Sequence, residues 1–116
     1  MTIEIINKQS HTKGVLYTIR VNDSIRKLSY LFHAIERIKR WKITEEMVAE
    51  TLLLPEEVIV GHRDRFIAHR RYGDHLVRAI YEYEERLPVL VAVCFLYSER
   101  YFKGGGIYED KIFKGS

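Results

Sequence analysis

The stretch VLVAVCFLY, residues 89–97, decides the fold because it is apolar at almost every position. A strand with one face in water alternates polar and apolar residues, whereas a continuous apolar run of this length is typical of a strand covered on both faces. We therefore expect residues 89–97 to lie in the centre of a sheet. Cys94, the single cysteine of the chain, is expected to be a buried small side chain there and not a nucleophile.

Three segments before this strand have the period of two that is typical of strands. They are EVIV at 57–60, RFIAHRRY at 65–72 and HLVRAIYEYEE at 75–85. Turn residues at 61–64, at 73–74 and around 86–88 separate them. The order predicts that the four strands follow one another as an antiparallel meander.

The N-terminal half is expected to hold two strands and two helices. IEII at 3–6 and VLYTIRV at 15–21 are rich in β-branched and aromatic residues, so they form a hairpin, or residues 1–13 form an attached arm. Asn22–Ser24 is a helix-start pattern, and apolar residues then recur at helical spacing to residue 38. A second helix is expected to begin after Thr44 as its N-cap and to end before Pro55.

These elements predict one α+β domain over residues 1–116, with a two-helix hairpin packed on one face of a largely antiparallel sheet of four to six strands. Residues 103–116, which include three consecutive glycines, are expected to form a flexible C-terminal tail. MTIEIINKQS lacks the charged and apolar regions of a signal peptide, and no apolar run approaches the roughly 20 residues that span a bilayer. We therefore expect a cytoplasmic protein without a membrane partner.

Positive charge is clustered in the 116-residue chain although its net charge is only +3. Residues 26–42 hold six Lys or Arg against one acid, and residues 61–78 hold five Arg against two acids. Such clusters are typical of surfaces that bind phosphate or an acidic protein, and they also occur on ordinary solvated faces. The charge pattern thus leaves both alternatives open.

Several chemistries find no support in the sequence. The histidines at 11, 33, 62, 69 and 75 have no i,i+4 histidine partner, and a cysteine pair is absent, so we expect no metal or cofactor. The alternating pair Glu82 and Glu84 is expected to keep a strand edge soluble. The glycines at 104–106 lack the Lys-Ser/Thr ending of a phosphate loop.

The segment GHRDRFIAHRRYGDH, residues 61–75, carries the strongest functional pattern, with four arginines and three histidines. Strand alternation places Arg65, His69 and Arg71 on one face, and Arg78 joins them from the next strand. Arginine offers a permanently charged fork that matches phosphate, and histidine or tyrosine can move a proton. The pattern predicts a phosphate-binding face near the turn at 73–74, with His62 and Arg63 contributed by the preceding turn.

The segments HAIERIKRWKITEEMVAETLLLPEEVI (33–59), HRDRFIAHRRYGDHLVRAIYEYEERLPVLVAVCF (62–95) and RYF (100–102) resemble a family of small bacterial and archaeal domains of unknown function. That family is similar to the BrnT-type toxins and lies near the RelE/ParE toxin superfamily. The resemblance covers about residues 31–102. It implies the RelE/ParE-like arrangement of a helix pair on an antiparallel sheet. It also implies a toxin of a type II toxin–antitoxin system that cleaves mRNA at the ribosome without a metal, together with a cognate antitoxin partner.

Carried onto this chain, the resemblance implies arginines that hold phosphate or stabilise the transition state and a histidine or tyrosine that transfers a proton. The predicted catalytic residues are Arg71, His69, Arg63, Arg100 and Tyr101. The predicted RNA- or phosphate-binding residues are Arg65, Arg70, His62, Arg78, Lys103, Arg37 and His33. Two alternatives stay open: a non-catalytic module that binds RNA or a protein, and a homodimer formed through the N-terminal strands.

Overall fold

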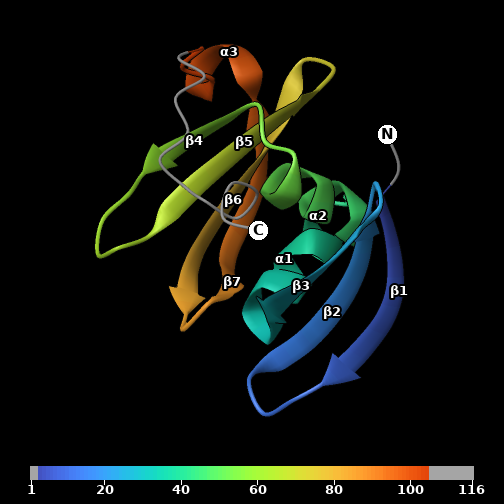
Figure 1. The fold of residues 1–116 in the computed structure, drawn as a ribbon. Coiled ribbons are helices and arrows are strands. Elements are labelled where there is room, and N and C mark those ends of the chain that lie inside the picture. Colours follow the sequence, from blue (N-terminus) through green and yellow to red (C-terminus); the bar gives the residue numbers. More distant parts are fainter. Residues whose placement is uncertain (1–2, 105–116) are drawn as a thin grey trace.

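The computed structural model describes residues 3–104, of which 55% lie in strands and 22% in helices. The elements follow one another along the chain as three strands, two helices, four strands and a final helical turn (Figure 1). Their bounds are β1 (Ile3–Ser10), β2 (Gly14–Val21), β3 (Ser24–Leu31), α1 (Phe32–Arg40), α2 (Glu45–Leu53), β4 (Glu57–Val60), β5 (Phe66–Tyr72), β6 (His75–Glu84), β7 (Leu87–Tyr97) and α3 (Ser98–Tyr101).

Within the described residues the strands form one seven-stranded mixed sheet in the order β1-β2-β3-β7-β6-β5-β4. β3 and β7 run parallel over the pairs Ser29/Val89 and Tyr30/Leu90, and this pairing joins an N-terminal antiparallel meander to a C-terminal one. The central position expected for the apolar strand is confirmed, since β7 is fourth in the order. The predicted architecture, a helix hairpin on an antiparallel sheet of four to six strands as in RelE/ParE, is wrong.

The largest difference between the sequence-based prediction and the structure lies at residues 24–31. The pattern predicted a helix there, but Ser24–Leu31 is β3 and pairs with β2 along its whole length. Asn22 takes a left-handed conformation, φ 55°, which turns the chain into a hairpin and not into a helix. Leu28 and Tyr30 alternate into the core at 0% exposure, whereas Ile25, which the helical spacing would have buried, is 48% exposed.

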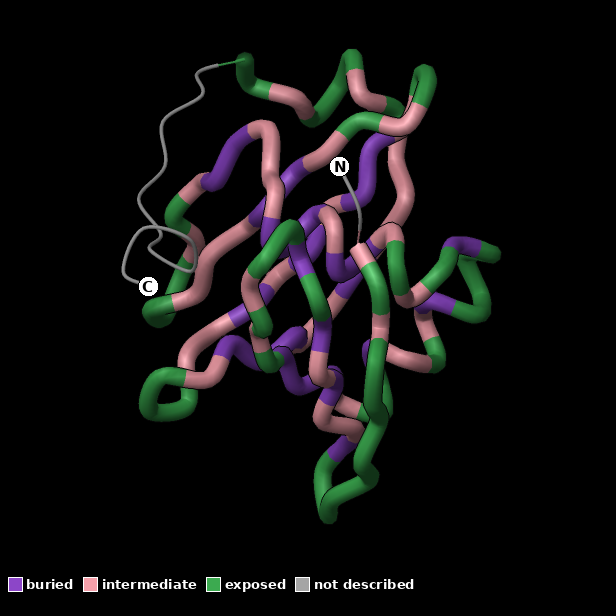
Figure 2. The backbone as a smooth tube through the Cα atoms, turned by 45° about the vertical axis from the view of Figure 1, so that its right-hand side comes forward, coloured by how far each residue is buried: buried purple, intermediate pink, exposed green. Residues whose placement is uncertain are grey.

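The helices α1 and α2 lie on the same face of the sheet, in front of it in Figure 1. The α2 N-cap expected at Thr44 is confirmed: its Oγ1 accepts a hydrogen bond from the Met47 N–H at 3.0 Å. Apolar side chains from the two helices and from the facing side of the sheet form the main core. Figure 2 shows the buried residues gathered where the layers meet and the exposed ones at the hairpin turns.

Glu45, the first residue of α2, holds the N-terminal meander to the helix. Its carboxylate accepts hydrogen bonds from Lys8 Nζ at 2.7 Å and from the Tyr17 hydroxyl, while the Tyr30 hydroxyl donates to its carbonyl at 3.1 Å. Burial and the adjacent carboxylate raise the pKa of Tyr17, and burial raises that of Tyr30. We call Lys8, Tyr17, Tyr30 and Glu45 the Glu45 network.

Two of the expectations concern the ends of the chain. Residues 3–10 of the predicted N-terminal segment form β1, at one edge of the sheet. Of the predicted tail 103–116, the structure describes Lys103 and Gly104, and the remaining residues lie outside the described part. Between residues 3 and 104 no helix has the length and apolar character that a membrane span needs.

Candidate nucleic-acid interface

The face of the sheet opposite α1 and α2, which we call the far face, carries a polar row across four neighbouring strands. Strand pairing places Glu57 of β4 opposite His69 of β5, His69 opposite Arg78 of β6, and Arg78 opposite Cys94 of β7. The predicted alternation of β5 and β6 is confirmed, since His69 and Arg78 share this face. Side chains directly opposite one another in a sheet lie within contact range.

Glu57 and His69 form a buried pair, with 2% and 0% of their surfaces exposed. His69 Nδ1 lies 2.7 Å from Glu57 Oε2. His69 Nε2 lies 2.9 Å from Arg78 Nη1. Because a guanidinium can only donate, Nε2 must accept, so His69 is the neutral tautomer that donates its Nδ1–H to Glu57.

The Glu57 carboxylate also fastens the segment that follows α3. Its Oε2 accepts from the Lys103 N–H at 2.8 Å and its Oε1 from the Gly104 N–H at 2.9 Å. Burial works to raise the pKa of Glu57, but these hydrogen bonds and that of His69 bring it below its ordinary value. Glu57 therefore stays ionised and joins β4, β5 and the C-terminal segment.

Arg78 is partly exposed, unlike its buried neighbours Glu57 and His69 in this row. Burial lowers the pKa of His69, and the charge of Arg78 lowers it further against the opposing effect of Glu57. The Arg78 guanidinium also lies over the Tyr101 ring, 5.6 Å from its centroid. His69 fixes Nη1 and Tyr101 lies against one face of the guanidinium, and Arg78 is also one of the residues that line a pocket on this face. We call Glu57, His69 and Arg78 the Glu57 network.

A pocket of about 510 Å³ lies beside Arg78 on the far face. Ile67 of β5 and Ile80 of β6 supply its apolar floor, and the other lining residues are Gly61, His62, Arg63, Arg65 and Arg78. Arg65 is paired with Glu82 at 3.7 Å, and both side chains are partly exposed. Three guanidiniums and an imidazole thus surround one hollow, which we call the basic pocket.

The turn that carries Arg63 is held in a costly conformation. Arg63 and Asp64 both have positive φ, 58° and 61°, and the Arg65 N–H donates to the His62 carbonyl at 3.2 Å. This geometry is a type I′ turn, which glycine and asparagine favour. An L-residue such as arginine costs roughly 1–2 kcal/mol in the left-handed region. Strain of this kind is more common at functional sites than elsewhere.

Several predicted site residues lie away from the basic pocket. Arg70 is on the helix side, where it donates to the Leu54 carbonyl at 2.6 Å and pairs with Glu50 at 3.4 Å. Arg71 is on the far face but is held by Glu56, with Nε 3.1 Å from Oε1. His33 and Arg37 belong to α1, and Arg100 and Lys103 are exposed near α3. The structure brings together His62, Arg63, Arg65, His69, Arg78 and Tyr101.

Arg71 is engaged on two sides. Its guanidinium stacks over the Phe102 ring, 4.0 Å from the centroid, in addition to the ion pair with Glu56. The hydrogen bond from Arg71 lowers the pKa of Glu56, and the same contact raises the pKa of Arg71. Arg71 therefore helps to anchor the segment after α3, whereas Arg78 faces the pocket.

Sequence reasoning missed Glu57, Ile67 and Ile80 as parts of the site. Glu57 opens the strand EVIV and shares its face with Ile59, so alternation would have placed one acid opposite the basic strand. The pattern gave no indication that this acid is buried and bound to Lys103 and Gly104. The two isoleucines lie at every second position with Arg65, His69 and Arg78 and so share their face. They could have been recognised as the apolar floor between the charged side chains.

The charges around the basic pocket are suited to holding an anion. Among residues 3–104 no three His, Cys, Asp or Glu side chains lie close enough together to hold a metal ion. Burial raises the pKa of the Cys94 thiol, which lowers its reactivity as a nucleophile. The polar side chains that line the pocket are three guanidiniums and the His62 imidazole, and the Tyr101 phenol lies beside Arg78.

Comparison with known proteins returned no match: no family model fits the chain, and neither a curated protein nor a solved structure is significantly similar to it.

Proposed function

We propose that this chain binds RNA through its phosphate groups, at the basic pocket on the far face of the sheet. The observation that carries the proposal is Arg78, whose guanidinium is held by a buried, neutral histidine at the rim of a pocket that already contains Arg63 and Arg65. A pre-positioned guanidinium fork matches two oxygens of a phosphate group.

The basic pocket favours a phosphodiester over a carboxylate ligand. One carboxylate needs one guanidinium, as Glu56 and Arg71 illustrate elsewhere in the molecule. Three arginines around one hollow suit a group with more oxygens and a neighbouring charge, such as the RNA backbone. The Tyr101 ring, 37% exposed beside Arg78, offers a surface on which an unpaired base can stack.

Each residue has a distinct part in this proposal. Arg78 and Arg63 donate to the phosphate oxygens, and Arg65 adds charge while it remains paired with Glu82. His69 is fully buried, so it is a positioning residue that holds Arg78 and does not touch the RNA. Glu57 in turn keeps His69 in the tautomer whose Nε2 accepts from Arg78.

A second candidate function is cleavage of the bound RNA without a metal, as the resemblance to toxins predicts. The observation that favours it is the contact between Arg78 and Tyr101, which brings a charge stabiliser and a proton carrier together. Cleavage products that form in the presence of a chelator and are lost in Tyr101→Phe would support it. The cognate antitoxin and the ribosomal target stay predictions.

RNA binding is tested by fluorescence anisotropy with a labelled 12-nucleotide single-stranded RNA over a range of salt concentrations. We expect the logarithm of the binding constant to fall linearly with the logarithm of the salt concentration, with a slope of about 0.7 per phosphate contact. The double variant Arg63→Ala/Arg78→Ala should bind more weakly and with a shallower salt dependence.

The single variant Arg78→Ala has a matched control, Arg40→Ala, which also removes one positive charge but from α1, where Arg40 pairs with Glu36 at 3.3 Å. It should leave the affinity and the salt dependence close to those of the unchanged protein. If Arg40→Ala weakens binding as much as Arg78→Ala does, the attraction is a property of the net charge and the proposed site is wrong.

A further inference from the structure

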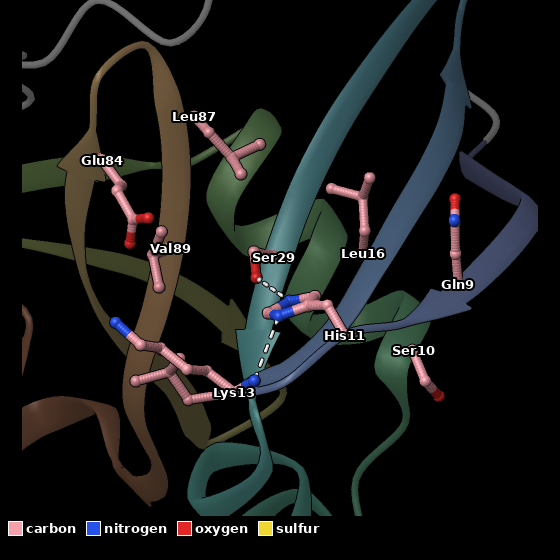
Figure 3. Close-up of a pocket in the computed structure, with 10 residues that line it drawn as sticks. Gln9, Ser10, His11, Lys13, Leu16, Ser29, Glu84, Leu87 and Val89 are labelled. Atoms are coloured by element: carbon pink, nitrogen blue, oxygen red, sulfur yellow. Dashed lines mark hydrogen bonds between the residues drawn. The ribbon is translucent and has the colours of Figure 1, made fainter.

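The far face carries a second pocket, of about 300 Å³, at the junction of the two meanders (Figure 3). In Figure 3 His11 and Ser29 bound it on one side, and Glu84, Leu87 and Val89 lie on the other. Its full lining is Gln9, Ser10, His11, Lys13, Leu16, Ser29, Leu31, Glu84, Leu87 and Val89. An apolar base with a few polar groups at the rim is the usual make-up of a small-ligand site.

The two pockets are linked through β6. Ile80 lines the basic pocket and Glu84 lines the second pocket, and both residues point to the far face because their positions differ by an even number. Four residues along a strand correspond to about 13 Å. A ligand in the second pocket therefore lies on the same surface as a phosphate in the basic pocket, one or more nucleotides away.

Hydrogen bonds exclude a serine nucleophile in the second pocket. The Lys13 N–H donates to His11 Nδ1 at 3.2 Å, so a neutral His11 carries its proton on Nε2. Nε2 lies 2.9 Å from Ser29 Oγ and must donate to it. A general base would need the reverse arrangement, with Nε2 accepting from the serine. The pair therefore shapes a binding site and leaves the Ser29 hydroxyl proton free to donate to a ligand.

We propose that the second pocket binds a guanine base of the RNA whose phosphate occupies the basic pocket. This inference rests on the proposed RNA binding and adds a base preference to it. The carboxylate of Glu84 can accept from the two neighbouring N–H groups of the guanine pairing edge. The Lys13 ammonium, whose side chain in Figure 3 ends on the side of Glu84 and Val89, can donate to the adjacent oxygen.

The other bases do not match this pair of charges. Adenine and cytosine present an accepting ring nitrogen beside their amino group, and that nitrogen would face the Glu84 carboxylate. Uracil has a single N–H between two oxygens. A volume of about 300 Å³ lies at the lower end of the range for ligand pockets, so it suits one ring system and not a whole nucleotide.

The test compares two labelled octanucleotides, one of adenosine alone and one with a single central guanosine, by anisotropy at fixed salt. We expect the guanosine oligonucleotide to bind about tenfold more tightly, the usual effect of one good two-point base contact. Glu84→Gln should reduce this preference to near unity, because the amide no longer offers two acceptor oxygens to the two guanine N–H groups. The control Glu36→Gln, on α1, should keep the preference.

Equal affinity of the unchanged protein for the two oligonucleotides would overturn the guanine site alone, since binding itself would stand. A guanosine preference that persists in Glu84→Gln would also overturn it, because the base would then be recognised elsewhere. If neither oligonucleotide binds, the proposed function fails and the inference fails with it. A chemical-shift change at Ser29 on addition of guanosine monophosphate, and not adenosine monophosphate, would locate the base independently.

Discussion

Two glutamates, Glu45 and Glu57, organise opposite halves of the molecule in contrasting ways. Glu45 holds β1, β2 and β3 to α2 with two tyrosines and a lysine. Glu57 holds β4, β5 and the segment after α3, and passes through His69 to Arg78. The Glu45 network ends on its own carboxylate, whereas the Glu57 network ends on a guanidinium at the rim of a pocket.

This difference separates a structural network from one with a further use. Around Glu45, the Tyr17 hydroxyl satisfies the partly buried carboxylate and the Tyr30 hydroxyl satisfies the backbone carbonyl. A buried Glu–His pair that leads to an arginine costs more desolvation than an apolar replacement would. This desolvation cost is expected at a site where the arginine must be held in a fixed position for a ligand.

The largest expected effect is the loss of stability in Glu57→Ala. The change leaves the buried His69 Nδ1–H without its acceptor, and it removes the acceptor that holds the N–H groups of Lys103 and Gly104. We expect the free energy of unfolding in urea to fall by about 3 kcal/mol or more. Glu45→Ala should cost less, since the Glu45 side chain is 27% exposed and water can replace it. Equal losses would remove the contrast between the two networks.

The second-largest expected effect is on RNA affinity, which should change when the Glu57 network is altered and not when the Glu45 network is. Arg78→Ala removes a charge-assisted contact, so we expect about a tenfold loss of affinity for single-stranded RNA by anisotropy. Tyr17→Phe removes a hydrogen bond of the Glu45 network and should lower stability by about 1–2 kcal/mol without changing RNA affinity. An RNA affinity that falls in Tyr17→Phe and not in Arg78→Ala would reverse the assignment.

The two networks should also fail at opposite ends of the pH range. The pKa of folded His69 lies below its ordinary value of 6.5, so the unfolded chain takes up that proton first and stability falls as pH drops below about 6.5. The pKa of Tyr17 lies above its ordinary value of 10.0, so stability falls as pH rises past about 10. Urea unfolding at intervals from pH 5 to 11 measures the free energy of unfolding through both the acid limb and the alkaline limb, that is, the two declines in stability.

Two variants test which group causes the loss of stability at low pH and which causes it at high pH. His69→Gln should flatten the decline between pH 6.5 and 5, and Tyr17→Phe should flatten part of the alkaline decline. An acid limb that persists unchanged in His69→Gln would mean that another group controls it, and the buried neutral histidine would lose its support.

The smallest expected effect concerns the strained turn. Arg63→Asn keeps a residue that tolerates positive φ and removes the charge, so we expect stability to rise by up to about 1 kcal/mol while RNA affinity falls. Thermal unfolding and anisotropy on the same sample check both parts. Loss of stability together with unchanged affinity would show that the Arg63 side chain serves the fold and not the pocket.

Local patterns in the sequence were enough to predict the C-terminal meander. β4 to β6 alternate and β7 is a continuous apolar run, so the four strands and the central place of β7 follow from short-range rules, although β7 begins at Leu87 and not at residue 89. The segment Ser24–Leu31 fits both a helix and a strand, and its pairing with β2 over eight positions decided the outcome. That pairing is a tertiary effect that no local window contains.

The candidate site was predictable to a similar extent. Alternation grouped Arg65, His69 and Arg78 on one face, because the period of a strand is fixed. It could not reveal that Glu56 occupies Arg71 or that Arg70 serves the end of α2. The Glu57 contacts to Lys103 and Gly104 join residues 46 and 47 positions apart, which only the folded chain brings together.

The most direct test follows the imidazole nitrogens of His69 by NMR while single-stranded RNA is added. If the Glu57 network ends at the RNA site, a phosphate bound by Arg78 alters the hydrogen bond that Arg78 donates to His69, so the His69 Nε2 resonance shifts and saturates at the RNA concentration that saturates anisotropy. The resonances of His33, on α1, should stay in place. Saturable RNA binding that leaves His69 unchanged and moves His33 would contradict the account and transfer the interface to the helices.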